Sequence, residues 1–236
     1  MNHALLGTLN LLIYFAGAVT IVFSIRVLFT INDEVFRKLL HFVLLGSFLV
    51  FIFSFSTWQI TAIAAIAFEV LVYPILALFE RIKNYSEFTT ERKKGELKRS
   101  LMLVYTMFAI VVAICWGLFT DRYLAIASLY AWGIGDAAAA LVGKKYGIHK
   151  IWTKYLDGKK SYEGTLAMYI VSCISVFSIL LLRGGMPIIF CLIISLVVGA
   201  ISAMAELYSK DGNDTIFCPL AAMAALVPLV YLFGGM

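Results

Sequence analysis

The sequence predicts an all-α membrane protein, a polytopic bundle of about eight transmembrane helices that forms a single domain over residues 1–236. Of the 236 residues, 62% are hydrophobic and 14% are charged, whereas soluble domains carry about 45–50% apolar and about 25% charged residues. The apolar residues are contiguous and do not alternate, which excludes a transmembrane β-barrel. So little polar material cannot cover the surface of a soluble enzyme.

The apolar runs define the expected spans. Helices of about 17–25 apolar residues can cross a bilayer core about 30 Å thick. The first run is not expected to be a cleaved signal peptide, because Met1 to Leu6 contains no Lys or Arg and the run is too long. Eight segments are long enough to span: residues 5–29, 39–55, 58–79, 101–119, 123–142, 164–182, 186–205 and 216–233.

The basic residues predict the orientation. Seventeen of the 19 Lys and Arg residues fall in one alternate set of connections, and only Arg122 and Arg183 fall in the other. The positive-inside rule therefore places both termini outside and the basic loops in the cytoplasm. This bias explains the net charge of +5 without a nucleic acid partner. The sequence leaves the oligomeric state open.

Asp136 is the clearest candidate for chemistry, because an Asp at the centre of a transmembrane helix costs about 2.5–3.5 kcal/mol on the insertion scale. It stands between Gly133 and Ala140, six residues before the expected helix end at Val142, which is roughly 9 Å along the axis. The surrounding Gly and Ala predict close helix packing but do not explain a carboxylate. We expect Asp136 to act as a metal ligand or a base.

Two segments rich in Gly and Lys follow, residues 143–147 and 157–165. Glycine N–H groups and lysines beside a helix N-terminus suit a phosphate. The second segment is not a Walker A loop, because Lys159 stands where Gly should precede Lys160 and Ser161. A positive anchor at the membrane surface is the alternative interpretation. Proximity to Asp136 favours phosphate binding, since phosphoryl transfer needs a metal-binding carboxylate and a phosphate site on one face.

Further acids are expected on the same side. Glu163 opens one span, Glu206 closes the next, and Asp214 precedes the last. With Asp136 they could hold Mg²⁺ through a few oxygens plus substrate phosphates. Asp211 is expected to be an ordinary loop residue.

Arg37 and His41 are spaced i,i+4 and share a helix face near the bundle entrance. A structural role is the alternative for His41. The four cysteines show no metal-binding spacing and are expected to pack as small apolar residues.

These motifs resemble the CTP-dependent lipid-alcohol kinases, a family that includes dolichol kinase, phytol kinase and the diacylglycerol kinase that uses CTP. The resemblance covers about residues 37–220, and its most specific part is the Gly-Asp block followed by the Gly-Lys-Lys-Ser block. Where the family typically reads Asp-Asn, this chain reads Asn213-Asp214-Thr215. The matching segments are residues 37–41, 92–100, 135–147, 158–165 and 206–219.

The resemblance implies an integral membrane kinase that transfers the γ-phosphate of CTP to a membrane lipid alcohol (polyprenol, dolichol, phytol or diacylglycerol), with Mg²⁺ as cofactor. The cytoplasmic face would carry the site. Implied catalytic residues are Asp136, Glu163 and His41; implied metal ligands are Asp136, Glu163, Glu206 and Asp214; implied nucleotide contacts are Arg37, Glu96, Lys98, Lys144, Lys145, Gly158, Lys159, Lys160 and Ser161.

Two other functions compete. A phosphatidate cytidylyltransferase, which makes CDP-diacylglycerol, would use the same CTP, metal and lipid phosphate. A small cation-coupled transporter or scaffold would use Asp136 and Glu69 as ion-pathway residues. Transport, however, does not require Gly-Lys motifs in cytoplasmic loops.

Overall fold

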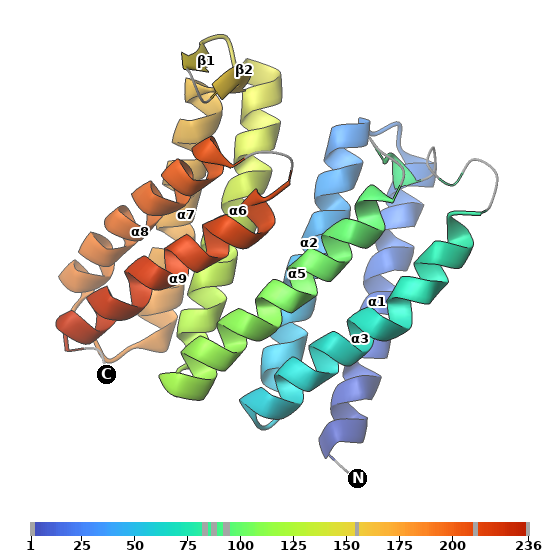
Figure 1. Ribbon diagram of the computed structural model, residues 1–236, viewed down its shortest axis with the longest axis horizontal. Helices are drawn as coiled ribbons and strands as arrows, with labels where there is room; N and C mark the ends of the chain where they lie inside the picture. The colour runs from blue at the N-terminus through green and yellow to red at the C-terminus, as the bar shows by residue number, and fades with distance from the viewer. Residues whose placement is uncertain are drawn as a thin grey trace. The chain divides into compact units, whose positions relative to one another are not determined.

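The structure is a computed structural model that describes residues 3–81, 85, 89–91, 95–153, 156–209 and 212–234, with the backbone alone described at His3, Thr153, Asp157 and Lys159. Within these described residues, eight helices are long and apolar enough to cross a membrane, and Figure 1 shows their arrangement within each part of the chain; this confirms the predicted fold class. The orientation of the termini stays a prediction. Outside the described residues lie Asp211 and six of the basic loop residues: Lys83, Arg92, Lys93, Lys94, Lys154 and Lys210.

The chain divides into two compact units, residues 1–113 and 114–236. Whether they act as the expected single domain stays a prediction. The first unit holds α1 (His3–Leu28), α2 (Asp33–Ser54), α3 (Trp58–Phe79) and α5 (Glu96–Val112), and a π-helix, η1 (Ala113–Leu118), follows at the division. The second unit holds α6 (Arg122–Tyr146), β1 (Lys150–Thr153), β2 (Leu156–Ser161), α7 (Tyr162–Arg183), α8 (Ile188–Tyr208) and α9 (Asp214–Leu232).

Aromatic side chains form the core of the first unit, in which α2, α3 and α5 pack together. The ring of Phe48 stacks on Phe108 with centroids 4.7 Å apart, and Phe51 meets Tyr105 edge to face at 5.7 Å. The Tyr105 hydroxyl lies 2.8 Å from the Ser47 hydroxyl, so its polar end is satisfied inside the core.

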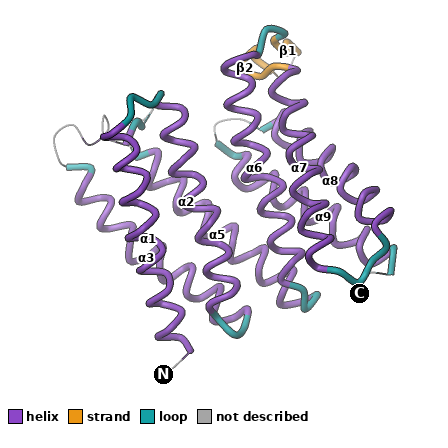
Figure 2. Tube along the Cα trace, turned by 180° about the vertical axis from the view of Figure 1, so that it is seen from behind, coloured by secondary structure: helices purple, strands orange, loops and turns teal. Residues whose placement is uncertain are grey.

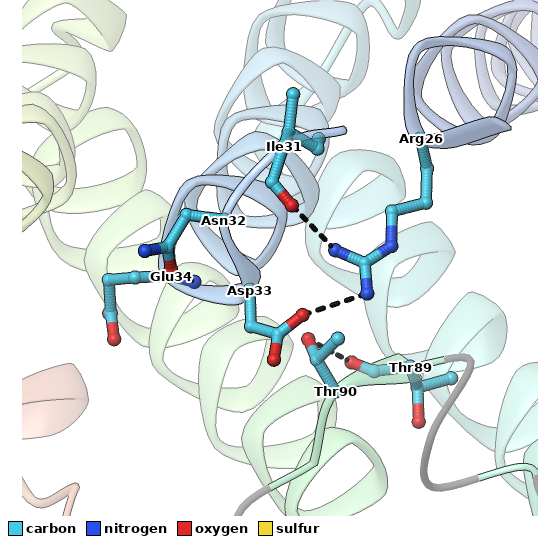
Figure 3. A network of polar contacts seen from close by, with 7 residues as sticks. All are labelled: Arg26, Ile31, Asn32, Asp33, Glu34, Thr89 and Thr90. Atoms are coloured by element: carbon cyan, nitrogen blue, oxygen red, sulfur yellow. Dashed lines mark hydrogen bonds and ion pairs between the residues drawn. The ribbon is translucent and has the colours of Figure 1, made fainter. Parts of the chain in front are cut away.

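The start of α2 differs from the sequence prediction, since the helix begins at Asp33 and not at residue 39. The Asn32 side chain caps it by accepting a hydrogen bond from the Glu34 N–H at 2.9 Å, and the two acids of the first turn favour the positive helix end. Arg26, at the end of α1, donates to the Ile31 carbonyl (3.1 Å) and the Asp33 carboxylate (2.8 Å), as Figure 3 shows. Polar contacts therefore extend α2 beyond its apolar run.

In the second unit, α6 packs against α7, α8 and α9. The contact with α7 is close: a Cβ added at Gly135 would lie 2.4 Å from Ser172 Oγ, and the Ser172 hydroxyl donates to the Ala131 carbonyl at 2.6 Å. A Cβ at Gly164 would lie 3.0 Å from the Ala139 carbonyl oxygen. The small residues around Asp136 thus let two helices approach, as their composition predicts.

The connection between α6 and α7 is an antiparallel β-hairpin and not the loop expected from the sequence (Figure 2). Lys150 pairs with Ser161, and Trp152 pairs with Asp157. Gly158 has a positive φ of 73°, and a Cβ there would lie 2.3 Å from the Trp152 ring. Both the backbone conformation and the Trp152 contact therefore require glycine in the Gly-Lys-Lys-Ser block.

The end of α6 also differs from the expected one. The helix continues past Val142 to Tyr146, so Lys144 and Lys145 lie in its last turn, where cations are favoured. Asp136 stands ten residues before that end, which is about 15 Å along the axis and not 9 Å. At the other end of α6, Asp121 caps the helix and its carboxylate pairs with Arg183.

Candidate active site

One polar contact in the second unit joins β2 to the end of α8. The Lys160 ammonium contacts the Glu206 carboxylate and donates to the Glu206 backbone carbonyl at 3.0 Å. The Glu206 side chain is 6% exposed, and the Lys160 side chain is 30% exposed. The buried acid is therefore paired with a cation that solvent can reach.

Two further carboxylates belong to the same group. The charges of Asp136 on α6 and Asp214 on α9 act on Glu206. All four charged groups also act on the thiol of Cys218, which is fully buried on α9. We call Asp136, Lys160, Glu206 and Asp214 the charged cluster. Its three carboxylates outnumber its single ammonium.

Glu163 occupies a separate place at the start of α7. Its Oε1 lies 2.6 Å from Nδ1 of His149 and accepts the His149 N–H at 3.2 Å. Glu163 Oε2 and Thr165 Oγ1 are buried and have no hydrogen-bond partner among the described residues. The first turns of α7 therefore hold two buried polar atoms that form no hydrogen bond with any described residue.

The predicted magnesium ligands are only partly brought together. No group of three or more His, Cys, Asp or Glu side chains is placed to hold a metal ion in the described part of the chain. The oxygen donors nevertheless suit Mg²⁺, which usually takes one or two carboxylates and completes its shell with waters and substrate phosphates. The carboxylates of the charged cluster suit that requirement in kind and number, although Lys160 contacts Glu206.

The predicted phosphate residues of the second unit fall on two elements, α6 and β2. Ser161 is buried and caps α7 by accepting the Gly164 N–H at 3.2 Å, a role that its motif did not reveal. Gly158 and Lys159 lie on β2. Lys144 and Lys145 are exposed on α6, and the Lys145 ammonium lies 5.0 Å from the Tyr146 ring centroid.

The remaining predicted residues belong to the first unit. Arg37 pairs with Glu34 one turn earlier on α2, at 3.3 Å, and His41 is half-buried. Lys98 on α5 pairs with Glu80 at 3.0 Å, and Glu96 opens the same helix. Whether these residues take part in one site with the charged cluster stays a prediction.

The acids around the start of α5 have structural uses that the sequence did not indicate. The Glu91 carboxylate accepts the N–H groups of Gly95 (3.2 Å) and Leu97 (3.1 Å). Burial, followed by the charges of Glu91 and Glu80, raises the pKa of Tyr85 to about 12, so its phenol stays neutral. Deeper in this unit, buried Glu69 accepts a hydrogen bond from Thr106 at 3.2 Å.

Comparison with known proteins identifies one informative relative. The chain is 33% identical over 105 residues to the phytol kinase of Synechocystis sp., a stretch that covers 44% of this chain and 43% of the relative. The chain thus spans less than half of that relative's length. No family model matches the chain, and no solved structure matches it. The resemblance to lipid-alcohol kinases is confirmed as distant homology to one of them.

Proposed function

We propose that this protein is a CTP-dependent kinase that transfers the γ-phosphate of CTP to the hydroxyl of a membrane lipid alcohol. The observation that carries the proposal is the charged cluster, in which Glu206 of α8 contacts a lysine of the Gly-Lys-Lys-Ser strand and the charges of carboxylates on α6 and α9 act on Glu206. Phosphoryl transfer needs carboxylates that bind a divalent cation and a positively charged side chain that contacts the phosphates. The charged cluster contains both kinds of group. The distant homology to a phytol kinase supports the same reaction class.

In the proposed reaction, the alcohol oxygen forms a bond to the γ-phosphorus while the bond from that phosphorus to the β–γ bridging oxygen breaks. CDP leaves, and the alcohol proton passes to a carboxylate. Asp136 is our choice for that acceptor, because the deepest carboxylate of the cluster is the one that a lipid hydroxyl reaches first from the bilayer.

Glu206 and Asp214 would hold Mg²⁺ together with substrate phosphates, and Glu163, whose Oε2 has no hydrogen-bond partner among the described residues, would supply a further oxygen. When bound, the ion offsets the charge that develops on the phosphate oxygens. Lys144, Lys145 and Lys159 would contribute further positive charge to the nucleotide phosphates.

The proposed substrates enter from different sides. Apolar helices give a lipid alcohol access from the bilayer, whereas a charged nucleotide must arrive from water. The basic residues predict that this aqueous side is the cytoplasm.

The test uses the purified protein in nanodiscs with CTP labelled on the γ-phosphate, offered phytol, polyprenol, dolichol, diacylglycerol or phosphatidate. We expect label on one or more of the four alcohols and release of CDP. Release of labelled pyrophosphate with phosphatidate would instead identify a cytidylyltransferase. Transfer to no lipid would overturn the kinase proposal and favour a transporter or scaffold.

A further inference from the structure

Lys160 belongs to the predicted nucleotide contacts, yet its ammonium is already engaged by protein groups. It contacts the Glu206 carboxylate and the Glu206 carbonyl at the end of α8. A carbonyl in the last turn of a helix attracts a cation, and a carboxylate that is 6% exposed requires one. The Lys160 ammonium therefore compensates the negative charge of Glu206, as a bound cation would.

A second observation concerns the same helix, α8, which also holds a buried hydroxyl without a hydrogen-bond partner among the described residues. Ser202 precedes Glu206 by four residues and lies on the same face of α8, one turn earlier in the helix. Its side chain is fully buried, and its hydroxyl has no hydrogen-bond partner among the described residues. A serine in a helix can satisfy itself on the carbonyl four residues earlier, but this one does not, which leaves its oxygen available to a ligand or water.

We infer that Lys160 is an exchangeable counterion: its ammonium holds Glu206 until substrate binds, then moves to the nucleotide phosphates and leaves the Glu206 carboxylate to a divalent cation. This inference rests on the proposed function and adds a regulation of the same site. Lys160 is suited to the exchange because its side chain is 30% exposed and a lysine stem is flexible.

The exchange has a thermodynamic consequence. Lys160 and a divalent cation compete for one carboxylate, so the cation should bind weakly until phosphates draw Lys160 away. Coupling between two ligands must be reciprocal, and it typically changes affinity by about 5- to 150-fold. The competition can be measured without turnover, because removing Lys160 should strengthen cation binding to the protein alone.

The first experiment measures Mn²⁺ binding by electron paramagnetic resonance, without nucleotide, in nanodiscs of zwitterionic lipid. Lys160→Met should bind Mn²⁺ at least about fivefold more tightly than wild type. Lys150→Met is the matched control, because it removes the same charge from the other strand of the hairpin. An equal gain in both variants, or no gain in Lys160→Met, would overturn the exchange and leave Lys160 as a structural anchor.

The second experiment covers the case in which Lys160→Met fails to fold. Glu206→Gln keeps the shape of the side chain but releases Lys160, so CTP without metal should bind at least about fivefold more tightly than to wild type. Unchanged or weaker CTP binding would contradict the exchange. If wild type binds no CTP under any condition, the proposed function fails, whereas the Mn²⁺ comparison still decides the competition at Glu206.

Discussion

The charge of Asp136 is not explained by the packing of α6. Its neighbour Gly135 explains the close contact of α6 with α7, but that contact needs no charge. The carboxylate instead acts on Glu206 across the bundle. Sequence alone predicts its importance, because a charge at membrane depth is costly. Sequence alone could not reveal the other members of the charged cluster, which come from β2, α8 and α9.

We expect Asp136→Asn to lower lipid phosphorylation by about 100- to 10,000-fold, the usual contribution of a general base. The variant keeps the size of the side chain and removes its charge. Asp121→Asn is the matched control, since Asp121 begins α6 at the other end and pairs with Arg183. Turnover per folded molecule should survive in the control. Equal losses in both variants would argue that charge in α6 serves folding.

Gly135 gives a prediction about packing at the same scale. An added Cβ would lie 2.4 Å from Ser172 Oγ and 2.6 Å from Met168 Sδ. Gly135→Ala should therefore lower the free energy of unfolding by about 1–3 kcal/mol, the cost of overpacking. Gly17→Ala is the control, because nothing lies within 4 Å of its Cβ position. Thermal unfolding in detergent measures both, and a stable Gly135→Ala protein would refute the tight contact.

At the scale of elements, the hairpin is the largest departure from the sequence prediction. Its strands are only 4 and 6 residues long, and one of them contains Asp, Gly and two Lys, which strands normally disfavour. Pairing between β1 and β2, and the contact of Trp152 with Gly158, stabilise it instead. The apolar spans were predictable because each is a local pattern. A cross-strand pair joins two separate segments, so no single run of residues predicts it.

Ser161 gives the prediction at this scale. Its motif suggested nucleotide binding, whereas the structure gives its side chain the N-cap of α7. Ser161→Ala should lower the free energy of unfolding by about 0.5–2 kcal/mol, because a Gly164 N–H loses its acceptor. Ser56→Ala, at an exposed position between α2 and α3, should change it by less than about 0.5 kcal/mol. Equal stability of the two variants would show that the Ser161 cap does not stabilise α7.

At the scale of the whole molecule, the number of spans was predicted from composition, and their direction is predicted from charge. Eight helices long and apolar enough to span a membrane are confirmed in the part of the chain that the structure describes, and their ends differ from the apolar runs where caps or lysines extend a helix. Which candidate residues the second unit brings together was not predictable from the sequence, because it depends on packing between distant segments. The direction in which the helices cross the membrane can be tested by thiol labelling at exposed loop positions.

We expect a membrane-impermeant thiol reagent applied from outside the cell to label Ser56→Cys. It should label Ile148→Cys only after the membrane is permeabilised, because the hairpin follows the basic end of α6. Both positions are exposed, and Cys115, Cys191 and Cys218 are at most 1% exposed. Replacing half-buried Cys173 by Ala completes the background. The reverse labelling pattern would invert the orientation and move the proposed site out of the cytoplasm.

The π-helix at Ala113–Leu118 has a consequence for how the length of the chain can vary. A π-helical turn contains more residues than an α-helical turn, so it behaves as the trace of an inserted residue within a span. Deleting one residue there lets the turn revert to α-helix and keeps the preceding α5 face intact. The same deletion within α3 would rotate every later side chain of that helix by about 100°. Natural deletions in this span should therefore concentrate in the π-helical turn.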